Sequence, residues 1–212
     1  MFDRPIMFDP LGWHPVALST DLPPGSVAGT RLSGQEVALW READGSPHAW
    51  QDRCPHRGMR LSFGFVRGDR LACLYHGWQF DGAASCRHVP AHPDLAVPAG
   101  IRLPRYQARD HGPLLWVGPE AQAATPPACP ADAVGLRSFG ILASMAAIAT
   151  RLGPGTPFHE LPLTGGTVLV LLQPLSAEET MLHALWRGSA AGRPAAIEHL
   201  ARLRRSLEAA SC

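Results

Sequence analysis

Short apolar runs that alternate with turn residues fill the first half of the chain. Three strand-like runs lie at residues 29–32, 36–40 and 48–52. Gly34 and the segment 44–46 separate them as hairpin turns. An earlier run, residues 13–17, is expected at the edge of a sheet, because Pro15 has no N–H to donate to a second neighbouring strand. The pattern therefore predicts an antiparallel, mainly β domain.

The pattern changes after an Ala- and Pro-rich stretch, residues 119–135, which we interpret as a linker. Residues 138–152 predict a helix that ends before a Gly-Pro pair, and a strand is equally defensible for the first half of that segment. The continuous apolar runs 167–173 and 181–186 predict a β-hairpin. These elements indicate a second, small α+β part over residues 136–212.

A last helix is expected from Pro194 to about residue 210, because proline suits the first turn of a helix. Four apolar residues share one face of that helix at the spacing of an amphipathic element. They are Ile197, Leu200, Leu203 and Leu207.

Two Cys-His pairs interrupt the first half of the chain. One residue separates Cys54 from His56, two separate Cys73 from His76, and the segment 57–72 lies between the pairs. Two sulfur and two nitrogen ligands suit zinc, or an iron–sulfur centre in which histidines replace cysteines on one iron. Between the pairs, apolar residues on both sides of a Gly-Asp turn predict a hairpin that returns the second pair toward the first.

The residues around the pairs carry a family resemblance. They are the segments 54–58, CPHRG, and 75–81, YHGWQFD. With the spacing above, they are similar to the Rieske [2Fe–2S] domain of the ring-hydroxylating, non-haem iron oxygenase alpha subunits, over about residues 10 to 118. The resemblance implies that Cys54 and Cys73 bind one iron of one [2Fe–2S] cluster and that His56 and His76 bind the other. A four-ligand zinc site and a decayed site that binds nothing are the alternatives.

Three further residues are candidates to surround such a cluster: Arg57, Tyr75 and Trp78. Tyr75 is in a position to donate a hydrogen bond to a ligating sulfur and so to adjust the reduction potential. Packing around the ligand loops is the alternative role of Tyr75, and it is the favoured role of Trp78.

Composition narrows the class of protein and its compartment. The chain has 212 residues, 46% of them hydrophobic, and a formal net charge of +1, so there is no basic field for nucleic acid. No apolar run approaches the roughly 20 residues that span a bilayer. The first ten residues lack the apolar segment of a signal peptide. The cysteines outside the pairs, Cys86, Cys129 and Cys212, do not form a disulfide framework. We expect a cytoplasmic protein without a membrane anchor.

In the oxygenases that this chain resembles, a helix-grip catalytic domain follows the Rieske domain and holds a mononuclear iron through two nearby histidines and a carboxylate. Here the later histidines are His159, His183 and His199, with at least 15 residues between neighbours. His159 also lies in a Gly- and Pro-rich stretch unsuited to a helix. We therefore interpret residues 136–212 as a small α+β remnant of part of that catalytic domain, without its own mononuclear iron.

The sequence thus divides into a Rieske domain (1–118), a linker (119–135) and a small α+β domain (136–212). The expected function is to carry one electron at a time from a reductase or ferredoxin to an oxygenase partner. One alternative is a complete hydroxylase or demethylase with an unusually short catalytic domain. Another is an iron–sulfur protein that senses redox state or has a structural role. An oligomer is possible.

Overall fold

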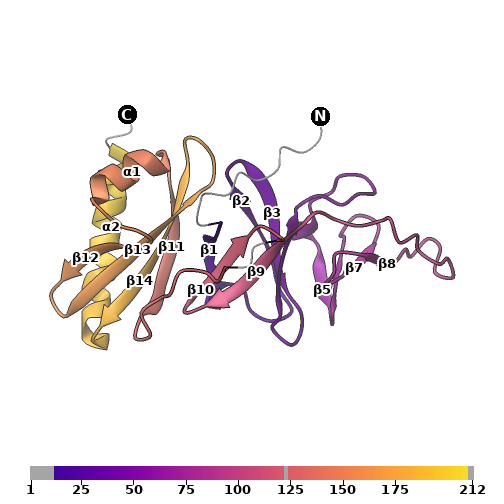
Figure 1. Cartoon of the computed structure of the whole chain (residues 1–212), viewed down its shortest axis with the longest axis horizontal. Coiled ribbons are helices and arrows are strands. Elements are labelled where there is room, and N and C mark those ends of the chain that lie inside the picture. Colours follow the sequence, from indigo (N-terminus) through magenta and orange to yellow (C-terminus); the bar gives the residue numbers. More distant parts are fainter. Residues whose placement is uncertain (1–11, 122–123, 210–212) are drawn as a thin grey trace.

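A computed structural model describes residues 12–121 and 124–209. Figure 1 shows three antiparallel sheets following one another along the long axis of the molecule, with the C-terminal sheet at one end and the smallest sheet at the other. The predicted mainly β architecture is confirmed, and the only α-helices in the described part of the chain lie in its C-terminal third.

The central sheet has six strands in the order β1-β10-β9-β4-β3-β2. Its strands are β1 (His14–Leu18), β2 (Val27–Leu32), β3 (Gln35–Arg41), β4 (Pro47–Gln51), β9 (Arg105–His111) and β10 (Leu114–Gly118). The first strand lies at the edge, as its proline predicts, and its register with β10 shifts just after Pro15. A 3-10 turn, η1 (Ser19–Asp21), follows β1 in the connection to β2.

The smallest sheet has the strand order β5-β6-β7-β8. Its strands are β5 (Phe65–Arg67), β6 (Arg70–Ala72), β7 (Gln79–Asp81) and β8 (Cys86–His88). The predicted Gly-Asp turn joins β5 to β6, and the hairpin is shorter than the apolar stretch before the turn, because Leu61–Phe63 forms a 3-10 turn, η2. The carboxylate of Asp52 accepts hydrogen bonds from the Ser62 amide (2.7 Å) and hydroxyl (2.5 Å), and these bonds hold the turn in place.

An aromatic core lies between the central and the smallest sheets. Trp40, Trp50 and Phe80 are at most 1% exposed. The rings of Trp40 and Trp50 meet edge to face with centroids 4.9 Å apart, and Trp50 meets Phe80 in the same way at 6.4 Å. Because Cys54 and Cys73 belong to the same buried cluster, the two predicted ligand loops rest on a tightly packed base.

The C-terminal sheet has the strand order β11-β14-β13-β12. The elements of this part are β11 (Val134–Ile141), α1 (Met145–Leu152), β12 (His159–Leu163), β13 (Gly166–Pro174), β14 (Thr180–Gly188), η3 (Ala190–Gly192) and α2 (Arg193–Ala209). The segment 138–152 is a strand in its first part and a helix in its second, and the side chain of Ser144 caps that helix. Strand β12 was missed. It tolerates Pro162 because it lies at the edge of the sheet.

The predicted last helix is present, but one residue of its apolar face was wrong. Ile197 is 41% exposed, whereas Ala196 is fully buried against the sheet. The buried stripe is Ala196, Leu200 and Leu207, with Leu203 packed beside them. Positions 196, 200, 203 and 207 have the i, i+4, i+7 and i+11 spacing of a single helix face. The small residue of this face, Ala196, is fully buried where the helix packs on the sheet.

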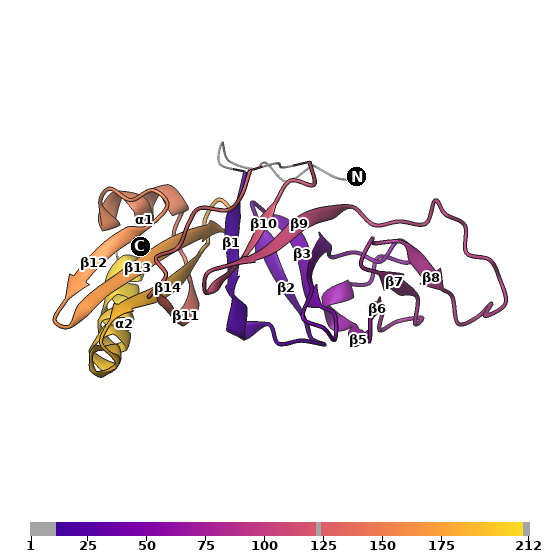
Figure 2. The same cartoon turned by 60° about the horizontal axis from the view of Figure 1, so that its bottom comes forward.

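The two faces of the C-terminal sheet have different neighbours. Figure 2 shows α2 on one side of this sheet and the central sheet on the other. Leu169, Leu171 and Leu185 pack against Trp116 of the central sheet and against Trp13, which directly precedes β1. The N-terminal and C-terminal parts of the chain therefore share one apolar core at this junction.

A buried chain of hydrogen bonds crosses the same junction. Gln173 donates through Nε2 to the Thr30 hydroxyl (2.9 Å) and to a backbone carbonyl of β2 (2.7 Å), so its Oε1 must accept from Nε2 of His183 (3.0 Å). With its proton on Nε2, the neutral ring of His183 accepts at Nδ1, and the hydroxyl of Ser138 donates to it (2.8 Å). Each side-chain nitrogen and oxygen of Gln173 and His183 thus has a hydrogen-bond partner, and the donor and acceptor of each bond are determined.

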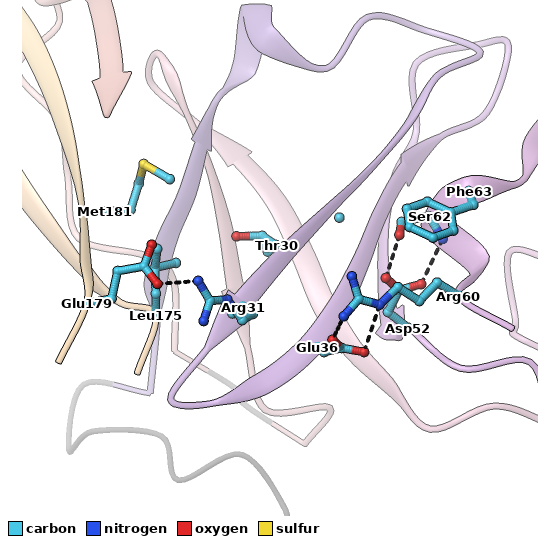
Figure 3. Close-up of a pocket in the computed structure, with 11 residues that line it drawn as sticks. Thr30, Arg31, Glu36, Asp52, Arg60, Ser62, Phe63, Leu175, Glu179 and Met181 are labelled. Carbon is cyan, nitrogen blue, oxygen red and sulfur yellow. Dashed lines mark hydrogen bonds and ion pairs between the residues drawn. The ribbon is translucent and has the colours of Figure 1, made fainter. Parts of the chain in front are cut away.

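Beside that chain of bonds lies an open polar hollow of about 390 Å³ (Figure 3). Five charged side chains line it, and each has a partner within the hollow. They are Arg31 with Glu179, Arg60 with Glu36, and Asp52 with Ser62. Because Arg31 lies on β2 and Glu179 beside β14, the first of these ion pairs also joins the two parts of the chain.

Candidate metal centre

The two predicted ligand loops have the same backbone hydrogen bonds. The first loop follows β4, and the second joins β6 to β7. In each loop the cysteine amide donates to the carbonyl of the residue five positions later, from Cys54 to Met59 at 2.8 Å and from Cys73 to Trp78 at 2.9 Å. The loops therefore hold their shape through bonds of their own, although the histidine follows the cysteine by two residues in the first loop and by three in the second.

A glycine closes each loop. Gly58 and Gly77 have φ angles of 73° and 69°, in the left-handed region that favours glycine, and their amides donate to the cysteine carbonyls at 2.8 and 3.0 Å. A Cβ atom on Gly77 would lie 2.9 Å from the Pro90 ring. Both positions thus require the backbone freedom of glycine, which the sequence provides two residues after His56 and directly after His76.

The two cysteines are buried side by side, each 2% exposed. Burial, with a smaller contribution from the neighbouring Cys73, raises the pKa of the Cys54 thiol to about 12, while a hydrogen bond from the amide of His56 acts in the opposite direction. Without a cation such thiols stay protonated, whereas a bound metal ion deprotonates its thiol ligands. A pair of adjacent buried thiols fits an iron that carries two sulfur ligands from the protein.

The two histidines are exposed above the buried cysteines. Their ring centroids are 4.6 Å apart with the planes at 62°. The ring of Trp78 stacks on His56 at 4.5 Å and 5°, and the ring of Tyr75 lies on His76 at 3.8 Å and 37°. Partial desolvation lowers the pKa of His56, and the charges of His76 and Arg57 lower it further. Sulfur and nitrogen donors therefore occupy opposite sides of the site.

The residues predicted around the ligands have distinct positions. Trp78 and Tyr75 contact the two imidazole rings, and Arg57 is exposed beside His56. Tyr75 is 57% exposed. The hydrogen bond from its hydroxyl to a ligating sulfur remains a prediction.

The donors converge in pairs. Within residues 12–121 and 124–209, no three His, Cys, Asp or Glu side chains gather closely enough to hold a single metal ion. A single zinc ion would need four converging ligands, whereas each iron of a two-iron cluster takes two ligands from the protein and the rest from sulfide. The observed pairing of sulfur with sulfur and nitrogen with nitrogen fits the two-iron group.

The later histidines lie on three different elements: His159 on β12, His183 on β14 and His199 on α2. Both ring nitrogens of His183 are hydrogen-bonded to side chains. His159 is 6% exposed, and its Nδ1 donates to the Gly153 carbonyl at 2.9 Å.

Sequence reasoning missed three exposed apolar side chains in the part of the chain that carries the two loops. Leu74 is 57% exposed within the second loop, and Phe63 and Phe65 are 57% and 38% exposed on η2 and β5. Of these, Leu74 lies in the same loop as His76 and offers an apolar contact beside that exposed histidine. The signal in the sequence was available, since all three residues stand in or beside turns rather than in a buried strand.

Comparison with known proteins identifies the domain. The family model described as the Rieske [2Fe-2S] domain matches residues 12–105. The oxidoreductase NdmD of Pseudomonas putida is 43% identical over 105 residues, which are 49% of this chain and 18% of that protein. The 4beta-methylsterol monooxygenase of Methylococcus capsulatus is 42% identical over 112 residues, 50% of this chain and 30% of that protein.

A solved structure extends the likeness in fold to the C-terminal part. The crystal structure of apo dicamba monooxygenase superposes with a TM-score of 0.76 at 19% identity, covering 96% of this chain and 87% of that chain. The match is one of fold alone, because the identity is low.

This chain spans less than a third of the length of the two curated relatives named above. None of the helices in the described residues has the length and apolar character needed to cross a membrane. The matched region contains both Cys-His loops with their paired donors. Residues 12–105 of this chain are therefore a Rieske [2Fe-2S] domain, which implies a [2Fe–2S] cluster.

Proposed function

We propose that this chain is a one-electron carrier whose cluster is held by Cys54 and Cys73 on one iron and by His56 and His76 on the other. The observation that carries the proposal is the opposite burial of the two donor pairs. The cysteines are 2% exposed, whereas both histidines are exposed at the surface. Electrons therefore have a short route to and from a partner through the imidazole edge.

The bound cluster supplies reversible one-electron oxidation and reduction at a potential above that of plant-type ferredoxins. The protein residues determine where this exchange takes place. Cys54 and Cys73 keep the sulfur side away from water, and the imidazoles present their outer nitrogens to solvent, where they can take up a proton. The exposed Leu74 and Tyr75 lie in the same loop as His76 and offer an apolar contact to a docked partner.

We further propose that the chain holds no mononuclear iron of its own. Two observations on described residues support this. Hydrogen bonds occupy both nitrogens of His183, and His159 lies on an edge strand rather than on a helix beside a second histidine. Oxygen chemistry would then belong to a partner, with a reductase or ferredoxin as the electron donor and an oxygenase as the acceptor, in the cytoplasm.

A complete oxygenase is the second candidate, and one observation favours it. The likeness in fold to dicamba monooxygenase covers 96% of this chain and so includes the C-terminal sheet. In that case the chain would bind an additional ferrous iron and consume oxygen with a substrate.

Metal analysis and electron paramagnetic resonance distinguish these functions. After anaerobic reconstitution, the carrier contains two irons and two labile sulfides per chain. Its dithionite-reduced form gives one signal of low average g value and no high-spin ferrous nitrosyl with nitric oxide. A nitrosyl signal near one per chain would instead support the complete oxygenase. Colourless protein, or protein that holds only zinc, would refute both.

Electron transfer is then tested directly by mixing the oxidised protein with a reduced ferredoxin in a stopped-flow instrument. Reduction of the cluster at a rate that depends on the ferredoxin concentration supports the carrier. A cluster that stays oxidised with every reduced ferredoxin and reductase offered would favour a structural or sensing role.

A further inference from the structure

A second cavity, of about 270 Å³, lies at the junction of the two parts of the chain. Trp13 and Trp116 line it from the central sheet, Met145 and Ala149 from α1, and Leu171 from β13. Among the residues that the structure describes, no Asp, Glu or Arg side chain lines this cavity, which distinguishes it from the polar hollow of Figure 3. Its walls are thus suited to an apolar, uncharged molecule.

One polar atom in the wall of this cavity lacks a partner. His159 is 6% exposed, and its Nδ1 bonds to the Gly153 carbonyl at 2.9 Å. A carbonyl only accepts, so Nδ1 carries the proton, and Nε2 of the neutral ring is left as an acceptor. Among the residues that the structure describes, no donor bonds to this Nε2. This Nε2 is not fully buried, so solvent can reach it, and a ligand that donates to it would take the place of water.

Gly155 fits closely against the same imidazole. A Cβ atom at this position would lie 2.6 Å from Nδ1 of His159. The glycine therefore leaves room for the ring to sit in the cavity wall, and the bond to Gly153 fixes its orientation. The unpartnered nitrogen is held in place by the surrounding backbone.

We propose that this cavity binds one small, uncharged aromatic molecule that donates a single hydrogen bond to Nε2 of His159. A cavity of roughly 150 Å³ accommodates one benzene ring, so about 270 Å³ admits one or two fused rings. The two tryptophans and the neighbouring aliphatic side chains supply the apolar contacts. The proposal does not depend on the electron-carrier function, because no residue of the two Cys-His loops lines the cavity.

The test is isothermal titration calorimetry of the reconstituted full-length chain with indole and with 1-methylindole. The two probes have nearly the same shape, but only indole has an N–H to donate. We expect one indole per chain and binding of 1-methylindole weaker by about tenfold, the effect of one unmade buried hydrogen bond. Failure of both probes to bind at millimolar concentration would overturn the proposal, and so would equal affinity for the two.

Two variants locate the site. In His159→Phe, which removes the acceptor but keeps a ring, the affinities for the two probes become equal, whereas the control His199→Phe on α2 keeps the tenfold difference. In Ala149→Phe, which fills the cavity from α1, indole affinity falls at least tenfold. Ala146→Phe, on the exposed side of the same helix, leaves it unchanged. Wild-type affinity in Ala149→Phe would place the bound indole elsewhere and refute the assignment.

Discussion

Replacing His183 with Gln should make the free energy of unfolding depend less on pH between pH 7 and pH 4. His183 is 1% exposed, and burial lowers the pKa of its imidazole from 6.5 to about 4, with only a partial opposing effect from the Pro15 carbonyl. In the unfolded chain this group takes up a proton near pH 6.5, but in the folded protein it does so only near pH 4. The unfolded state therefore binds more protons throughout this interval, and stability falls as the pH falls.

The magnitude follows from the size of that difference. A difference between 6.5 and about 4, at 1.36 kcal/mol for each pKa unit, corresponds to roughly 3 kcal/mol of unfolding free energy lost between pH 7 and pH 4. The contribution is complete above pH 6.5 and roughly 1 kcal/mol smaller at pH 5.5. For a chain of this length, 3 kcal/mol corresponds to a fall of about 6–12 °C in Tm.

The assay is urea unfolding followed by tryptophan fluorescence at several pH values between 7.5 and 4.5, for the wild type and for His183→Gln. Glutamine does not titrate, so the variant should lose less stability in acid even if it is less stable at pH 7. Acid effects on the cluster are common to both proteins and cancel in the difference. His199→Gln, a half-buried histidine on α2, serves as the control and should follow the wild type. Parallel curves for wild type and His183→Gln would refute the reasoning.

Three further changes have defined outcomes. Asp110→Asn removes the charge that pairs with Arg41, whose side chain is 5% exposed. Because the Asp110 side chain is itself 38% exposed, the free energy of unfolding should fall by about 1–2 kcal/mol at pH 7, measured by urea unfolding. Burial alone would raise the pKa of Asp110, but the bonds from Arg41 and Ser19 lower it overall, so this cost should shrink as the pH falls below about 4. Gly64→Ala places a Cβ atom 2.2 Å from a backbone carbonyl and should lower stability by about 2 kcal/mol. Cys73→Ser should reduce bound iron from two per chain to nearly none and lower Tm, because cluster binding no longer stabilises the fold.

Each of these has an outcome that would contradict it. Asp21→Asn, a surface control, should cost less than 0.5 kcal/mol, and an equal cost for Asp110→Asn would show that the pair with Arg41 contributes nothing. Wild-type stability of Gly64→Ala would show that the turn can move away from β6. Full iron content in Cys73→Ser would remove this cysteine from the proposed ligand set.

The features that the sequence predicted well are local ones. The two Cys-His loops are defined within a few residues each, so their chemistry could be predicted without knowledge of distant contacts. Strands β1 to β4 of the central sheet begin and end within two residues of the predicted runs, because each alternates with a clear turn. The helix α2 was also predicted, but its rotation was wrong at Ile197, since the pattern favoured the larger residue over Ala196.

The features that the sequence did not predict depend on long-range pairing. Strand β12 contains a proline and forms only because β13 offers it an edge. The hydrogen bonds among Ser138, Gln173 and His183 join three strands and continue to β2. A signal was present, because Gln173 and His183 each interrupt an apolar run, and a polar residue in such a run must find a buried partner.

The first strand has a consequence for how the molecule can be divided. Although β1 belongs to the central sheet, Trp13 just before it and Leu18 at its end are buried with Leu169 and Leu185 of the C-terminal sheet. A proteolytic nick at the exposed Thr125 would therefore give two fragments that migrate together in a native gel and separate only in denaturant. Expressed alone, the C-terminal fragment would expose those leucines and aggregate.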